Sequence, residues 1–193
     1  MQAETLASAY RLWKRNWRGR GREYTAGALV WQVSTLRIGQ ISPYHTQIND
    51  CWPTTSWAIA DYFLRPKPAY FAIARELRPF TVGMKRKENT TFLDESSAVD
   101  LEIETILDVW GTNSTLSEKS ARLEITFFEL HSDWTHRFAE DIILRANSST
   151  ELFSGPLPGQ PTRTKLSQVP RVIVASARLL DEFGAVLGRH SNW

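Results

Sequence analysis

The sequence predicts an α/β segment followed by an all-β unit, and three patterns carry this prediction. Residues 2–17 have one apolar face at helical spacing, formed by Leu6, Tyr10, Trp13 and Trp17. The run GALVWQ at 27–32 is apolar and bounded by glycine, which is typical of a short buried strand. After residue 80, short alternating segments are separated by turn residues, which is typical of an antiparallel β-sandwich.

The first predicted helix is rich in basic residues. Six of them lie between positions 11 and 22: Arg11, Lys14, Arg15, Arg18, Arg20 and Arg22. Basic residues interleaved with aromatics are one signature of nucleic-acid binding. The helical period already accounts for the aromatics, however, and the net charge of the chain is only +2. We therefore expect no nucleic-acid partner, and a helix whose aromatics point inward while its Arg and Lys head groups point outward.

A loop and a second helix follow the predicted strand. Asn, Asp and Pro in the run NDCWP at 49–53 favour a turn. Pro66 and Pro68 mark the start of a helix, since proline is favourable in the first helical turn, and Pro79 ends it. This helix would carry a short apolar stripe of Ala69, Ile73, Ala74 and Leu77.

The alternating segments lie at 101–103, 121–130 and 171–180, and DEFG at 181–184 predicts a hairpin turn. Strands of this length at this spacing predict an immunoglobulin-like sandwich over 79–193.

Composition bounds the class of protein. The chain has 193 residues with 42% apolar residues, enough for one or two domains. No run approaches the ~20 apolar residues of a membrane span, and we expect no membrane partner. The first 25 residues lack the apolar core of a signal peptide, so we lean towards a cytoplasmic location, with secretion open if a longer parent carries a signal. N-glycosylation acceptor triplets begin at Asn89, Asn113 and Asn147.

A family resemblance emerges when residues 33–47 are left out. GALVWQ then runs directly into INDCWPTTSWAIADYFLRPKPAYFAIARELRPF. This resembles the end of the catalytic barrel in β-mannosidases of glycoside hydrolase family 2, where a strand ending in Trp-Gln leads to a hydrophobic residue, Asn-Asp and Trp-Pro. The stretch QAETLASAYRLWKRNWRGRGREYTAG resembles the helix before that strand, and VIVASARLLDEFGAVLGRHSNW is similar to a strand pair of the sandwich after the barrel.

The resemblance implies the domain organisation. Residues 1–78 would be the last helix–strand–helix of a TIM (β/α)8 barrel, with 33–47 as an atypical insert. Residues 79–193 would be an immunoglobulin-like sandwich, truncated at its C-terminus. A complete barrel needs about 250 residues, so this chain would be a C-terminal fragment.

The insert at 33–47 interrupts a motif that is otherwise continuous. It begins with Val-Ser and ends with Gln, which GTG-AGT and CAG could encode, and these are the ends of a typical intron. We favour a retained intron over a genuine loop insertion, because a loop here would displace Asn49 and Asp50 from Trp31.

The resemblance also implies the function. The parent reaction would be retaining hydrolysis of terminal, non-reducing β-D-mannose from β-mannoside oligosaccharides, without a cofactor. Such enzymes use two glutamates about 5–5.5 Å apart. Both are expected upstream, so this chain has no catalytic residue and should be inactive alone. The residues expected to shape the sugar subsite are Trp31, Gln32, Asn49, Asp50 and Trp52.

Two alternatives remain open. Gln47, Cys51 and His190 suit a papain-like cysteine peptidase as oxyanion donor, nucleophile and base, but the three residues after His190 leave no room for an orienting Asp or Asn at strand spacing. The other alternative is a non-catalytic carbohydrate-binding or interaction fragment. We expect no metal site, because the four histidines lack ligand spacing, and the sequence leaves the oligomeric state open.

Overall fold

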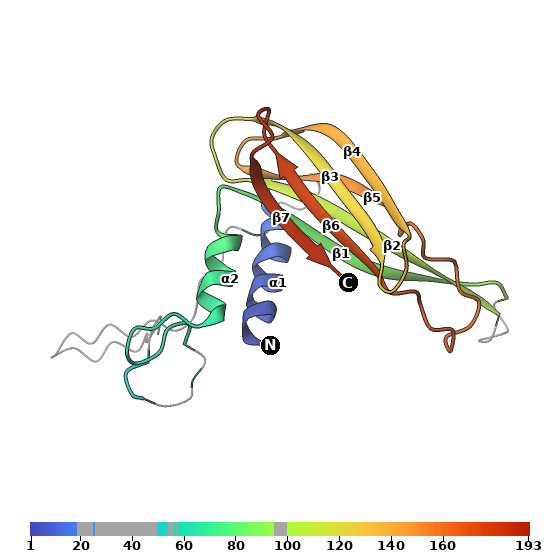
Figure 1. Ribbon diagram of the computed structural model, residues 1–193, viewed down its shortest axis with the longest axis horizontal. Helices are drawn as coiled ribbons and strands as arrows, with labels where there is room; N and C mark the ends of the chain where they lie inside the picture. The colour runs from blue at the N-terminus through green and yellow to red at the C-terminus, as the bar shows by residue number, and fades with distance from the viewer. Residues whose placement is uncertain (19–24, 26–49, 54–55, 57, 95–99) are drawn as a thin grey trace.

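The computed structural model describes residues 1–18, 25, 50–53, 56, 58–94 and 100–193. These residues form two helices and then seven strands (Figure 1). The elements are α1 (Gln2–Arg15), α2 (Pro68–Glu76), β1 (Phe80–Phe92), β2 (Leu101–Asn113), β3 (Lys119–Glu129), β4 (Thr135–Leu144), β5 (Ser148–Pro156), β6 (Ile173–Leu180) and β7 (Val186–Asn192). The strand predicted at 27–32 and the insert at 33–47 lie outside the described residues.

The strands form two antiparallel sheets packed face to face. One sheet has the order β1-β2-β5 and the other has the order β4-β3-β6-β7. The β-sandwich part of the predicted fold is therefore confirmed. The helices α1 and α2 lie side by side at one end of the sandwich (Figure 1). The barrel part of the prediction is not tested by this part of the chain and stays a prediction.

The core lies between the two sheets and follows from alternation along the strands. On β3, Leu123, Ile125 and Phe127 are all 0% exposed, while the residues between them face outward. Their neighbours in the core include Leu179 on the adjacent strand β6 and, from the opposite sheet, Leu107 on β2. Apolar residues at every second position place one face of each sheet in the core.

Part of the outer face of the three-stranded sheet, around Asp108 and Trp110, is covered by α1. Asp108 and Trp110 alternate with the core residues of β2, and both are buried although they point away from the core. The guanidinium of Arg15 lies 4.5 Å from the centre of the Trp110 ring. Gly83 faces Trp110 on the neighbouring strand, and a Cβ at Gly83 would lie 2.5 Å from the indole. Glycine is therefore required for the indole to lie flat between the sheet and α1.

The helix pair has its own small apolar cluster of Tyr10, Ile59, Ala69 and Ile73. The predicted orientation of α1 is wrong in one respect. Arg11 and Arg15 are only 6% and 8% exposed, whereas Trp13 is 43% exposed. The physical reason is that α1 packs on two neighbours, and its arginines face acidic groups of α2 and the sandwich.

The hairpin predicted at 181–184 is confirmed between β6 and β7. Gly184 adopts φ +80°, a conformation that glycine reaches without steric cost. The Asp181 carboxylate accepts hydrogen bonds from the backbone N–H groups of Phe183 (3.0 Å) and Ala185 (2.7 Å). Glu182 is an exposed residue of this turn.

Candidate functional site

The predicted sugar subsite is described only at two of its five residues. Trp31, Gln32 and Asn49 lie outside the described residues. Asp50 is 3% exposed, and its carboxylate accepts hydrogen bonds from the Ser56 hydroxyl and, at 3.1 Å, from the Lys67 ammonium.

Trp52 lies two residues further along this loop and is 72% exposed. In the described contacts Asp50 therefore connects this loop to Lys67, the residue just before α2, and the side chain of Trp52 is exposed to solvent. Their role in binding sugar stays a prediction.

Two charged clusters join the helix pair to the sandwich, and the first is centred on Asp108. This carboxylate is 2% exposed and lies 3.0 Å from Arg15 Nη2 and 2.8 Å from Lys87 Nζ. Ser154 donates a further hydrogen bond of 2.8 Å. Burial alone would raise the pKa of Asp108, but the hydrogen bonds from Lys87, Ser154 and Arg15 outweigh it and hold that pKa below its usual value. Arg15 also forms a two-pronged pair with Glu151 on β5.

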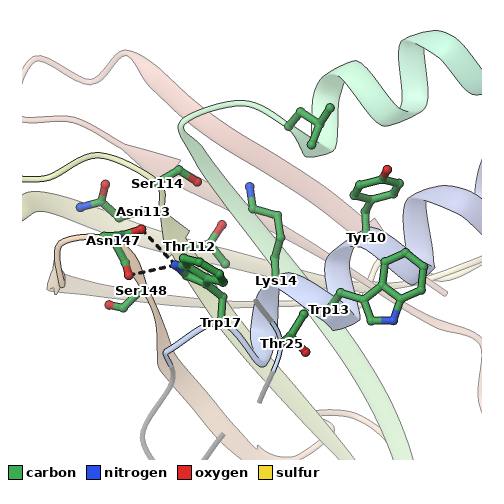
Figure 2. A pocket seen from close by; sticks show the side chains of 11 residues that line it. Tyr10, Trp13, Lys14, Trp17, Thr25, Thr112, Asn113, Ser114, Asn147 and Ser148 are labelled. Atoms are coloured by element: carbon green, nitrogen blue, oxygen red, sulfur yellow. Dashed lines mark hydrogen bonds between the residues drawn. The ribbon is translucent and has the colours of Figure 1, made fainter. Parts of the chain in front are cut away.

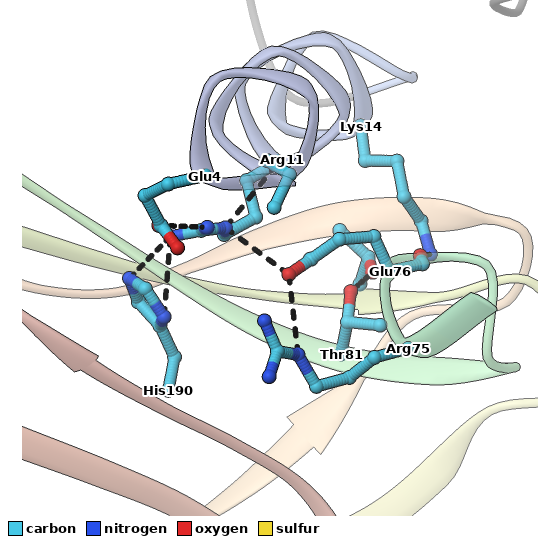
Figure 3. A network of polar contacts seen from close by, with 9 residues as sticks. Glu4, Arg11, Lys14, Arg75, Glu76, Thr81 and His190 are labelled. Carbon is cyan, nitrogen blue, oxygen red and sulfur yellow. Dashed lines mark hydrogen bonds and ion pairs between the residues drawn. The ribbon is translucent and has the colours of Figure 1, made fainter. Parts of the chain in front are cut away.

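The second cluster is centred on Arg11 (Figure 3). Its guanidinium lies 2.7 Å from a carboxylate oxygen of Glu4, 3.2 Å from one of Glu76, and 2.7 Å from Nε2 of His190. Burial, followed by the positive charge of Arg11, lowers the pKa of His190 to about 4. The imidazole is therefore neutral at physiological pH and accepts a hydrogen bond from α1.

Glu4 and Glu76 have pKa values shifted in opposite directions, as the two carboxyls of an acid–base pair often do. The hydrogen bond from Arg11 lowers the pKa of Glu4, whereas burial raises the pKa of Glu76. Glu76 is only 4% exposed, and the cavity beside it has a volume of only ≈ 10 Å³. Glu76 is therefore closed to a substrate, whereas Glu4, Arg11 and His190 line a cavity of ≈ 440 Å³. The contacts of this cluster join α1, α2 and β7.

The structure offers no support for the peptidase alternative. Cys51 lies half-buried in the loop before α2, while the ring nitrogens of His190 on β7 face Arg11. A base must lie within hydrogen-bond reach of the nucleophile that it activates. No group of His, Cys, Asp or Glu in the described part of the chain could hold a metal ion. Among the helices described, none is long and apolar enough to cross a membrane.

A cavity of ≈ 270 Å³ lies between α1 and one end of the sandwich (Figure 2). Aromatic side chains of α1 and the residues just after it form one wall: Tyr10, Trp13 and Trp17. Hydroxyl and amide residues near the end of β2 and the start of β5 form another wall, beside Trp17: Thr112, Asn113, Ser114, Asn147 and Ser148. Lys14, Thr25 and Leu77 complete the lining. The sequence indicated the aromatic stripe but not the polar wall, which comes from residues about a hundred positions away.

Hydrogen bonds fix two side chains in this cavity. The Trp17 indole N–H donates to both the backbone oxygen and Oδ1 of Asn147, each at 3.0 Å. The Lys14 ammonium donates to the backbone oxygens of Glu76 (2.8 Å) and Arg78 (3.3 Å), and burial lowers the pKa of Lys14 to about 8. Both side chains are therefore held in one orientation.

The three possible glycosylation sites differ in their surroundings. Asn89 is exposed on β1. Asn147 is half-buried and accepts the hydrogen bond from Trp17. Asn113 is 1% exposed, and its amide donates to the backbone oxygens of Ser117 (2.8 Å) and Leu144 (3.2 Å). Of these three residues, only Asn89 is exposed in the folded chain. Whether any of them is glycosylated stays a prediction.

A family of known proteins matches most of the sandwich. Residues 105–193 match the family described as "Mannosidase Ig/CBM-like domain".

The chain as a whole is similar to fungal proteins named Beta-mannosidase B. It is 39% identical to the one from Thermothelomyces thermophilus over 196 residues, which covers 100% of this chain and 21% of that protein. It is 32% identical to the one from Aspergillus flavus over 197 residues, covering 100% and 20%. The resemblance to β-mannosidases is thereby confirmed, and the chain spans about a fifth of the length of these relatives.

Solved structures support the fold. The β-D-mannosidase of Dictyoglomus thermophilum superposes with a TM-score of 0.65 at 22% identity, covering 99% of this chain and 18% of that one. An exo-chitosanase of Amycolatopsis orientalis superposes with a TM-score of 0.56 at 13% identity, covering 100% and 18%. The arrangement of a helix pair beside a sandwich therefore recurs within two larger glycosidases.

Proposed function

We propose that this chain is the C-terminal part of a β-mannosidase of glycoside hydrolase family 2. Residues 1–78 are the last helix–strand–helix of its catalytic TIM barrel, and 79–193 are the immunoglobulin-like domain that follows. The parent reaction is retaining hydrolysis of terminal, non-reducing β-D-mannose from β-mannosides. The observation that carries the proposal is the match of the full chain, helices included, to Beta-mannosidase B at 39% identity.

The exposed apolar surface of the helix pair supports the proposal that another part of a longer protein packs against it. Large apolar side chains on α1, α2 and the loop between them are 39–72% exposed: Leu12, Trp52, Tyr62, Phe63, Leu64, Tyr70, Phe71 and Leu77. Apolar residues gathered on one small unit in this number mark a surface that another part of a protein covers. In the proposal, the preceding strands and helices of the barrel cover it.

The chain alone would not hydrolyse a mannoside. The described carboxylates that are buried serve in ion pairs, as Asp50, Glu76 and Asp108 do. The acid/base and nucleophile glutamates lie upstream in the proposal, so both the proton donor and the nucleophile are absent from this chain.

A chimera tests the proposal. Residues 1–193 replace the matching fifth of the T. thermophilus Beta-mannosidase B, in one version with residues 33–47 and in another without them. Hydrolysis of 4-nitrophenyl β-D-mannopyranoside is measured for both, and for the 193-residue chain alone. We expect activity from the version without 33–47, at least tenfold less from the version with them, and none from the chain alone.

Two matched variants sharpen the chimera experiment. Trp52→Ala should raise KM by removing an exposed indole from the proposed sugar subsite, while Phe183→Ala, in the distant hairpin, should change nothing. A folded chimera without 33–47 that shows no activity contradicts the proposed function. Equal activity with and without 33–47 contradicts the retained-intron interpretation only.

A further inference from the structure

We propose that the cavity between α1 and the sandwich binds a single pyranose ring, as a site separate from the sugar subsite at the barrel end. The lining of this cavity includes neither Asp50 nor Trp52, the two described residues of the predicted subsite. The proposal goes beyond the proposed function, because nothing in the hydrolysis of a mannoside requires a second sugar site.

The aromatic wall supplies the surface on which a sugar ring packs. Tyr10 is held in place, since it is 4% exposed and meets Trp13 edge to face at 5.6 Å between ring centres. Trp13 is 43% exposed, so part of its indole remains available at the cavity. The C–H groups of a pyranose face carry partial positive charge, and the electron-rich face of an aromatic ring attracts them.

The polar residues of the lining, Lys14 of α1 included, keep hydrogen-bond donors and acceptors that a ligand can use. A lysine ammonium has three N–H donors, and Lys14 uses two of them on the backbone oxygens of Glu76 and Arg78. The Ser148 hydroxyl donates to Arg145 O at 3.2 Å and keeps acceptor lone pairs. Ser114 adds a hydroxyl at an exposed position. Sugar hydroxyls donate and accept at once, and a sugar ring also has apolar C–H faces, so it matches a mostly apolar lining that carries these few polar groups.

The size of the cavity limits the ligand. Its volume of ≈ 270 Å³ lies just below the range of about 300–1,000 Å³ that holds drug-sized molecules. One sugar ring fits this space, and a chain of several rings does not. A ligand as small as methyl β-D-mannopyranoside, bound at an ordinary efficiency for its atom count, gives a Kd on the order of 1 mM.

Titration of the 193-residue chain with methyl β-D-mannopyranoside tests the proposal, followed by ligand-detected NMR and by tryptophan fluorescence. We expect saturable binding with a Kd on the order of 1 mM. Trp13→Ala removes the stacking surface and Ser114→Phe fills the cavity from the β2 side, and each should weaken binding about tenfold or more. Phe183→Ala serves as the matched control and should leave the Kd unchanged.

Three outcomes overturn the proposal. The first is no saturation at concentrations about tenfold above the expected Kd. The second is binding that Trp52→Ala abolishes and Trp13→Ala does not, which places the sugar at the barrel end. The third is equal affinity for cyclohexanol, which shows an apolar cavity without sugar recognition. Circular dichroism of each variant separates lost binding from lost folding, and none of these outcomes bears on the chimera's activity.

Discussion

The sandwich core and the junction between the helix pair and the sandwich are both buried, yet they use opposite chemistry. The core is apolar, with Leu123, Ile125 and Phe127 at 0% exposure. The junction consists of Arg11, Arg15 and their carboxylate and imidazole partners. Apolar burial stabilises whichever packing removes most surface from water, whereas a desolvated ion pair gains little unless every partner is in place. The charged junction therefore fixes the position of the helix pair more than it adds to the stability of the fold.

The largest expected effect is in the core. Phe127→Ala leaves a cavity at the centre of the sandwich and should lower the free energy of unfolding by about 3–5 kcal/mol. Urea denaturation followed by far-UV circular dichroism measures the change. Phe183→Ala, at a side chain that is 86% exposed, is the control and should stay within about 0.5 kcal/mol. A loss below about 1 kcal/mol in Phe127→Ala would mean that the core carries less of the stability than its burial indicates.

A change at the junction should separate the two regions. Asp108→Ala removes the carboxylate that pairs with Arg15 and Lys87, and breaking a buried pair in this way costs about 3 kcal/mol. We expect hydrogen exchange to show lost protection in α1 while β3 and β6 stay protected. Asp108→Asn, which keeps the shape and a hydrogen-bond acceptor, should lose less. If α1 and β3 lose protection together, the two regions fold as one unit and the comparison fails.

The Arg11 cluster should make stability depend on pH. The pKa of His190 is about 4 in the folded chain and 6.5 ordinarily, so between these values the unfolded chain binds a proton that the folded chain does not. Stability is therefore lost as the pH falls from 6.5 towards 4, and the difference between the two pKa values corresponds to about 3 kcal/mol. Glu76, whose pKa is raised, acts in the opposite direction because its folded form binds the extra proton.

Comparison with His190→Gln isolates this histidine. Glutamine can accept the hydrogen bond from Arg11 but does not titrate, and Glu4, Arg75 and Glu76 remain in place around it. The unfolding free energies of the two proteins, measured from pH 4 to pH 8, should be similar above pH 6.5 and differ most at the acid end, where only the protein with His190 loses stability. A difference that does not vary with pH would show that His190 does not supply the pH dependence.

The smallest effect is expected at a charge pair outside both regions. Arg122 lies 3.0 Å from Asp141 across β3 and β4, with side chains that are 49% and 82% exposed. Exposed pairs of this kind contribute about 0.2–1 kcal/mol. Arg122→Ala should therefore change the unfolding free energy by less than about 1 kcal/mol, less in high salt. If Arg122→Ala lowered the unfolding free energy as much as Asp108→Ala does, buried and exposed ion pairs would contribute equally, and this prediction would be wrong.

Local patterns were sufficient to predict some elements from the sequence. The apolar stripe of α1, the prolines around α2 and the alternation in β3 and β6 each reflect periods that a few residues reveal. The strands β1, β4 and β5 were not predicted. The distal half of β1 carries Lys85, Lys87, Glu88 and Asn89, because that part of the strand is mostly exposed and needs no apolar alternation.

The junction required knowledge of distant residues. Arg15 and Asp108 are 93 positions apart, so no local period links them. One signal was available, because Asp108 stands inside the apolar run ILDVWG, and a carboxylate in a buried strand requires a cationic partner. Of the predicted sugar subsite, only Asp50 and Trp52 could be placed, and the sequence did not indicate that Asp50 pairs with Lys67.

The buried amide of Asn113 has a consequence for how this chain is produced. A glycan attached at that nitrogen would replace one of the two hydrogens that the folded chain donates to Ser117 and Leu144. Glycan transfer is covalent and would act on the chain before the sandwich closes. In a secretory host, the extent of modification at this one triplet would therefore divide newly made chains into a population that can fold and one that cannot. Bacterial cytoplasmic expression, in which no such glycan is attached, distinguishes a folding defect from a glycan defect.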